Sequence, residues 1–129
     1  MQGVLSDVAR ILLVDDDPVL LHVLTQMISH RVDRVVVESV SSPYSALDHV
    51  RSGQYDLVLS DVKMPGMNGL TLLREIKRIA PRTTVILMTG HGDPTLAMEG
   101  ENLGAADLLH KPLDRDKLTA TLKHLLKRT

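Results

Sequence analysis

The feature that most constrains the fold is a repeated alternation between a short apolar run and an amphipathic helical pattern. Five apolar runs occur, at residues 11–14, 35–40, 57–59, 85–88 and 106–109, and a helical pattern follows each of them. Continuous apolar strands that alternate with amphipathic helices are typical of a parallel sheet covered by helices on both faces. The sequence therefore predicts an α/β fold with three layers and a doubly wound, five-stranded parallel sheet.

Polar side chains mark the starts of the predicted helices. An N-cap side chain precedes the helical pattern at Asp17, Ser42, Asp93 and Asp114. In the first three cases proline follows at the first helical position, where it is well tolerated. The helix that begins at Pro94 contains Gly100, which costs about 1 kcal/mol relative to alanine, so we expect this helix to be loose.

Length and composition limit the functional classes that the chain can belong to. Its 129 residues fit a single domain, residues 1–129, with residues 1–9 as a loose lead-in. The absence of cysteine excludes disulfides and thiolate chemistry, and no apolar run is long enough to span a bilayer. A net charge of -1 and only two aromatic residues argue against direct nucleic-acid binding. No signal peptide is recognisable, so we expect a cytoplasmic domain without a membrane partner.

The residues that follow the predicted strands carry the chemistry. Right-handed crossovers place the carboxyl ends of parallel strands at one edge of the sheet, where ligands bind in open α/β folds. That edge should collect Asp15, Asp16, Asp61, Thr89 and Lys111. We expect Asp61 to face outward from the end of its strand, although an aspartate there can also do no more than cap the strand.

Together these side chains are suited to phosphoryl chemistry at a hard cation. Carboxylate oxygens without histidine or cysteine favour Mg²⁺, which takes one or two carboxylates and leaves another as a nucleophile. A carboxylate can attack phosphorus to give an acyl phosphate, and the developing charge then needs positive partners. Lys111 supplies a cation and Thr89 a hydroxyl donor, and we expect Lys111 to contact Asp61 before any transfer.

Four motifs suggest a family for this arrangement. The segments VDDDP, SDVKMPGMNG, MTGHGD and HKP occur in this order at the predicted strand ends. Together they resemble the receiver domain of bacterial two-component response regulators over residues 10–126, and MTGHGD is most similar to receivers of the nitrogen-regulation and nitrogen-fixation type. The resemblance implies a flavodoxin-like (βα)5 fold with strand order 2-1-3-4-5. It also implies phosphorelay signalling, in which a sensor histidine kinase or a phosphotransfer protein phosphorylates the domain and switches its conformation.

The resemblance further implies how a metal would be held. Asp61 matches the phosphoacceptor, which is also a Mg²⁺ ligand. Asp16 matches a carboxylate that binds Mg²⁺ directly, and Asp15 matches a neighbour that acts through water. The backbone carbonyl of Lys63 matches the third protein ligand. Such a domain takes part in its own phosphorylation and slow dephosphorylation but is not a turnover enzyme.

Other positions match the residues that respond to phosphorylation. Thr89 matches the switch hydroxyl, and Lys111 matches a lysine that precedes a cis proline. The Lys63 side chain and His91 occupy positions that tune the lifetime of the acyl phosphate. Leu108 departs from the family, which usually has tyrosine or phenylalanine three residues before the lysine. We therefore expect the phosphorylation chemistry to persist while the signal output differs.

Two other functions stay open on the sequence alone. The chain could be a small phosphatase of the haloacid-dehalogenase type, with Asp15 as nucleophile and Asp17 as acid/base, but this leaves the segment around Asp61 unexplained. It could also be a receiver-like binding module that works by contact alone, which Leu108 favours. A homodimer partner or an effector domain is expected to contact the face between the last two predicted helices.

Overall fold

The computed structural model describes residues 8–90 and 94–128, and these form one five-stranded sheet with helices on both sides. The strands are β1 (Ala9–Val14), β2 (Val35–Val40), β3 (Leu57–Asp61), β4 (Thr84–Thr89) and β5 (Asp107–His110). The helices are α2 (Pro18–Arg31), α3 (Pro43–Ser52), α4 (Gly69–Ile79), α5 (Pro94–Asn102) and α6 (Arg115–Leu125). Every strand pair is parallel and the order is β2-β1-β3-β4-β5, which confirms the predicted architecture.

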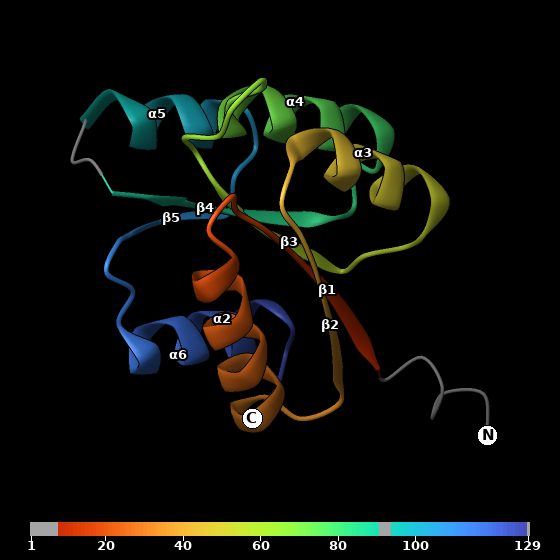
Figure 1. The fold of residues 1–129 in the computed structure, drawn as a ribbon, viewed down its shortest axis with the longest axis vertical. Helices are drawn as coiled ribbons and strands as arrows, with labels where there is room; N and C mark the ends of the chain where they lie inside the picture. The colour runs from red at the N-terminus through yellow and green to blue at the C-terminus, as the bar shows by residue number, and fades with distance from the viewer. Residues whose placement is uncertain (1–7, 91–93, 129) are drawn as a thin grey trace.

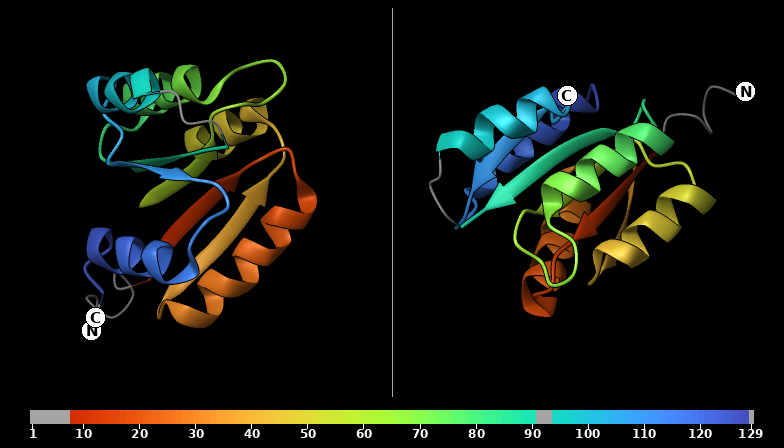
Figure 2. Two further views of the ribbon diagram at one scale, coloured as in Figure 1. Left: turned by 90° about the vertical axis from the view of Figure 1, so that its left-hand side faces the viewer. Right: turned by 90° about the horizontal axis from the view of Figure 1, so that it is seen from above.

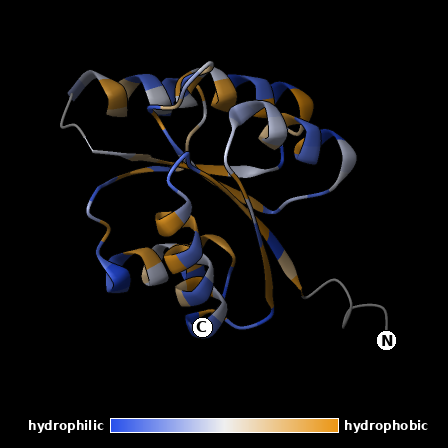
Figure 3. Cartoon of the chain, viewed as in Figure 1, coloured by the Kyte–Doolittle hydropathy of each residue, from blue (hydrophilic) through white to orange (hydrophobic). Residues whose placement is uncertain are grey.

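The helices form two layers, one on each face of the sheet. Figures 1 and 2 show α3, α4 and α5 on one face and α2 with α6 on the other. Each layer encloses its own aliphatic core, with Leu72 and Ile76 of α4 fully buried on the first face and Ile28 and Leu122 fully buried on the second. The apolar colour follows the strands and the inner sides of the helices in Figure 3. Burial on both faces explains why the central strands β3 and β4 are mostly apolar.

The helix starts follow the sequence where they can be compared. Asp17, Ser42 and Asp114 each accept hydrogen bonds from backbone N–H groups of the first turn, as predicted. Asn68 caps α4 in the same way through the Thr71 N–H, although the sequence did not single it out. The predicted cap at Asp93 lies outside the described residues.

Two strand boundaries need correction. Strand β1 begins at Ala9, inside the predicted lead-in, because the Ala9 N–H donates to the Arg34 carbonyl and the Arg10 N–H donates to the Asp56 carboxylate. Strand β5 runs one residue later than predicted, although the Ala106 N–H still donates to β4. Gly100 is the buried residue of α5, and a Cβ there would lie 3.1 Å from Leu87 Cδ1, so the glycine allows close packing against the sheet. The expected looseness of this helix stays a prediction.

The described ranges, 8–90 and 94–128, contain no helix with the length and apolar character required to cross a bilayer.

Candidate functional site

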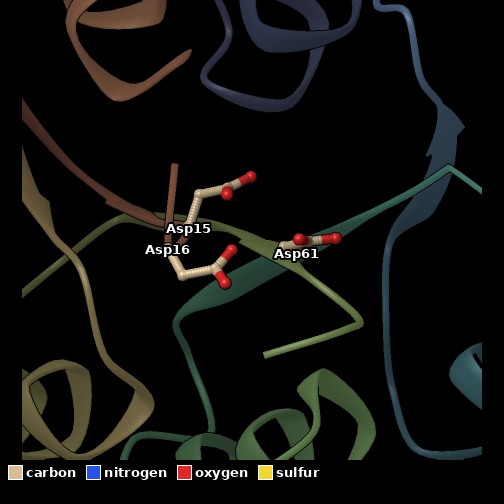
Figure 4. Close-up of side chains that lie close together, drawn as sticks. All are labelled: Asp15, Asp16 and Asp61. Carbon is tan, nitrogen blue, oxygen red and sulfur yellow. The ribbon is translucent and has the colours of Figure 1, made fainter. Parts of the chain in front are cut away.

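Two neighbouring strand ends bring three carboxylates together. Asp15 and Asp16 follow β1 directly, Asp61 ends β3, and Val14 pairs with Ser60 in the parallel register of these strands. One carboxylate oxygen from each aspartate lies within 4.8 Å of the others. Figure 4 shows the three side chains extending from the tips of the two strands into one region. The predicted convergence of the acids is therefore present.

Lys111 supplies a positive charge to this cluster from the end of β5. Its Nζ lies 2.8 Å from Asp15 Oδ2 and 3.2 Å from Asp61 Oδ2, so the expected contact with Asp61 exists but the shorter one is to Asp15. The backbone N–H of Lys111 donates to the Thr89 carbonyl at 2.7 Å, and the Lys111–Pro112 peptide bond is cis. Two strands thus fix the backbone from which the ammonium reaches the acids.

The three acids differ in their exposure to solvent. The Asp15 side chain is 1% exposed and the Asp61 side chain 10%, whereas Asp16 is exposed. The expectation that Asp61 faces outward was wrong, because its side chain is buried beside Asp15 and Lys111. Asp15 accepts two hydrogen bonds within the protein, since its Oδ1 accepts from the Asp17 N–H and its Oδ2 accepts from Lys111. Asp16 is the most accessible carboxylate of the cluster.

The electrostatics of the cluster are unbalanced. Burial, followed by the neighbouring charge of Asp15, raises the pKa of the Asp61 carboxyl above its ordinary value, although Lys111 opposes this effect. Burial alone would lower the pKa of Lys111, but the hydrogen bond and charge of Asp15, together with Asp61, raise it overall. Lys111 is therefore held as a cation, while Asp61 carries a charge that its surroundings disfavour.

Comparison with known proteins gives this arrangement a family. A family model described as the response regulator receiver domain matches residues 11–123. The chain belongs to this family. Receiver domains of this kind are signalling domains and not classical enzymes, and this membership does not favour the phosphatase alternative.

Curated relatives and a solved structure agree with this membership. Two-component response regulator ARR14 of Arabidopsis thaliana is 38% identical over 119 residues, which are 92% of this chain and 31% of that protein. Transcriptional regulatory protein FixJ of Bradyrhizobium diazoefficiens is 41% identical over 81 residues, which are 63% of this chain and 40% of that protein. The CheY-like response regulator receiver domain protein of Methanospirillum hungatei has a TM-score of 0.87 and 28% identity, over 93% of this chain and 94% of that one. The chain spans less than half of these curated relatives.

The remaining predicted residues of the receiver domain lie around the acids. Thr89 is buried at the end of β4, and its carbonyl accepts from the Lys111 N–H. Lys63 is exposed, and its backbone N–H donates to the Asp61 carboxylate. Leu108 is half-buried in β5 and packs against the core beneath α3 and α4. His91 lies outside the described residues.

Sequence reasoning missed two residues of the receiver domain that act on the Asp61 backbone. The Ser60 hydroxyl is buried and donates to the Asp61 carbonyl at 3.0 Å. Gly69 packs directly against the same carbonyl. Their positions beside and after Asp61 were visible in the sequence, but the contacts depend on how the loop between β3 and α4 folds back on the strand.

Proposed function

We propose that this receiver domain takes a phosphoryl group from a sensor histidine kinase or a phosphotransfer protein onto Asp61. The observation that carries the proposal is the placement of the Asp61 carboxylate between two further acids and the Lys111 ammonium. A carboxylate with a raised pKa, beside a cation at the carboxyl edge of a parallel sheet, is suited to bind and transfer an anionic group.

The donor set fits Mg²⁺. It contains only oxygen ligands, and the described cluster includes neither histidine nor cysteine. We assign Asp16, Asp61 and the backbone carbonyl of Lys63 as direct ligands. Asp15, which matches the family's neighbouring carboxylate, would act through water while its own ion pair with Lys111 is kept. When bound, the cation would neutralise charge on the phosphoryl oxygens.

The protein groups then divide the work of transfer. A carboxylate oxygen of Asp61 attacks the phosphorus of phosphohistidine, the new O–P bond forms, the P–N bond breaks and the imidazole leaves. Lys111 stabilises the negative charge on the phosphoryl group. Its ammonium, which pairs with the Asp61 carboxylate before transfer, then pairs with the phosphoryl oxygens. Thr89 supplies the hydroxyl that responds to the new group and biases the switch toward an active conformation.

Two observations bear on the output of the switch. The MTGHGD segment supports a receiver of the nitrogen-regulation or nitrogen-fixation type, and a relative named as a transcriptional regulatory protein supports coupling to an effector domain. A homodimer or an effector domain would use the face between α5 and α6, with Leu108 in place of the aromatic switch residue. Tuning of the acyl-phosphate lifetime by the Lys63 side chain and His91 stays a prediction, as does the cytoplasmic location.

Phosphoryl uptake followed by mapping tests the assignment of Asp61. The protein is incubated with acetyl phosphate and Mg²⁺, and the intact mass is measured before and after the incubation. We expect one phosphoryl group on the wild type and on Asp48→Asn, an exposed aspartate in α3 that serves as the matched control. Asp61→Asn should take up none while keeping its circular dichroism spectrum.

Two results would contradict the proposal. A label that maps to Asp15 would make that residue the nucleophile. No mass gain in a wild type that still binds beryllofluoride would favour a module that works by contact alone.

A further inference from the structure

We propose that Gly69 is a positioning residue for the phosphoacceptor, because any side chain at this position would displace the Asp61 backbone. Gly69 is the buried first residue of α4, and its N–H donates to the Val62 carbonyl at 2.7 Å. A Cβ built there would overlap the Asp61 carbonyl oxygen, and it would lie 2.8 Å from Val62 Cα and 3.1 Å from the Asp61 carbonyl carbon. All three atoms belong to the backbone, so no side-chain rotation can relieve the overlap.

Backbone conformation does not explain why this residue is glycine. Among the described residues, the glycines with positive φ are Gly66 and Gly104, and Gly69 is not one of them. Alanine is more favourable than glycine inside a helix, so local propensity alone would favour alanine at the start of α4. The close approach to Asp61 is therefore the feature that requires glycine at this position.

The contact with Gly69 affects the position of the acceptor because both the backbone and the carboxylate of Asp61 are held by neighbouring groups. The Ser60 hydroxyl donates to its carbonyl at 3.0 Å, and the Lys63 N–H donates to its carboxylate. The carboxylate itself lies 3.2 Å from Lys111 Nζ. Pushing the carbonyl away would move the carboxylate with it, relative to both Lys111 and the other acids. A misplacement of about 1 Å near reacting atoms can cost about 100-fold in rate.

The experiment compares Gly69→Ala with Asn68→Ala, a control at the same helix end. Asn68→Ala removes the cap on the Thr71 N–H and adds no atom near Asp61. The phosphorylation rate is measured at saturating acetyl phosphate and Mg²⁺, the dissociation constant for Mg²⁺ alone is measured by calorimetry, and thermal unfolding is followed by circular dichroism. We expect Gly69→Ala to slow phosphorylation by about 10- to 100-fold and to weaken Mg²⁺ binding. Asn68→Ala should lower the unfolding midpoint but change the rate less than about twofold.

A second variant changes the surroundings of the same carbonyl by removing a hydrogen bond and not by adding an atom. Ser60→Ala removes the hydroxyl that donates to Asp61, so it should slow phosphorylation in the same direction but by less than Gly69→Ala. Both results would support control of the acceptor through its own backbone. A Gly69→Ala protein that unfolds at ordinary temperature, combined with a wild-type rate for Ser60→Ala, would overturn the proposal by showing that residue 69 serves the fold alone.

The remaining outcomes also decide the question. A Gly69→Ala protein that is more stable than the wild type and is phosphorylated at the same rate would show that helix propensity, and not the contact, governs this position. Equal slowing in Gly69→Ala and Asn68→Ala would show a purely structural role. The rate readout rests on the proposed function, which fails separately if the wild type itself takes up no phosphoryl group. In that case the Mg²⁺ titration still tests the role of Gly69, because weaker Mg²⁺ binding by Gly69→Ala does not depend on phosphoryl transfer.

Discussion

Two half-buried charge clusters lie near opposite ends of the sheet, and they are balanced in different ways. Near the start of the strands, Arg10 of β1 donates to Glu38 at 2.7 Å, the Tyr55 hydroxyl donates to the other Glu38 oxygen at 2.8 Å, and the Arg10 guanidinium lies 4.6 Å from the centre of the Tyr55 ring. At the carboxyl edge, three aspartates lie together, and the Lys111 ammonium forms ion pairs with two of them, Asp15 and Asp61. The first cluster pairs one acid with one base, whereas the second has excess negative charge.

The pKa values separate the two clusters in the same way. Hydrogen bonds from Arg10 and then Tyr55 lower the pKa of Glu38, so that cluster stabilises the ionised acid. Burial and then the charge of Asp15 raise the pKa of Asp61, so the other cluster disfavours the ionised form of its acid. A cluster whose charges are balanced adds to the stability of the fold. A cluster with excess negative charge can instead attract a cation, which in turn can hold a phosphoryl group. The predictions below test this difference.

Lys111→Met should have the largest effect on stability. It leaves the buried carboxylate of Asp15 without its cation, and breaking such a pair costs about 3 kcal/mol of unfolding free energy. Mg²⁺ should restore part of this loss, because a bound cation relieves the same negative charge. Urea unfolding with and without Mg²⁺ measures both effects, and Lys117→Met, at an exposed position in α6, serves as the control. Equal losses in the two variants would mean that Lys111 does not balance the acids.

Mg²⁺ alone should stabilise the wild type. At a free concentration ten times the dissociation constant, ligand linkage predicts a gain of about 1.4 kcal/mol in unfolding free energy. Asp16→Asn should lose most of this gain, because Asp16 is the accessible carboxylate of the cluster, while Asp48→Asn should keep it. Thermal unfolding over a Mg²⁺ series provides the measurement. A gain that is unchanged in Asp16→Asn would place the cation elsewhere.

Asp61→Asn should raise stability at neutral pH in the absence of metal by about 1 kcal/mol, the size of a typical single-substitution effect. The folded-state pKa of Asp61 is raised, so its ionisation favours the unfolded state, and this penalty applies above that pKa. As the pH falls through the raised pKa, the wild type binds a proton and the difference between the two proteins should vanish. Urea unfolding at several pH values measures it. A loss of stability in Asp61→Asn that is the same at neutral and acidic pH would contradict the sign of this effect.

The fold, and which residues gather at the carboxyl edge, could be predicted from the sequence because both depend on periodic patterns. Apolar runs such as 57–59 locate strands, and parallel strands place Asp15, Asp61 and Lys111 at one edge without further information. The pattern could not show which acid Lys111 would contact at the shorter distance, because two carboxylates lie within reach of one flexible side chain.

Burial at the site was also beyond the sequence. Asp61 was expected to face outward, yet its side chain is only 10% exposed and is paired with Lys111. The contact of Gly69 with the Asp61 carbonyl depends on the path of the loop between β3 and α4, which turns set and a periodic pattern does not. The charge balance of Arg10, Glu38 and Tyr55 likewise joins three segments that no local motif connects.

Glu38→Gln should have the smallest effect and should leave phosphorylation unchanged, because it disturbs only the cluster whose charges are balanced. The Glu38 side chain is 34% exposed, so solvent screening limits the loss of unfolding free energy to below about 1 kcal/mol. Since its folded-state pKa is lowered, this contribution is present above the unfolded-state pKa and disappears as the pH falls through the folded-state value. The wild type and Glu38→Gln should therefore converge in acid, as Asp61→Asn and the wild type do, but from the opposite side. A Glu38→Gln protein that is more stable than the wild type at neutral pH, or that is phosphorylated more slowly, would remove the distinction between the two clusters.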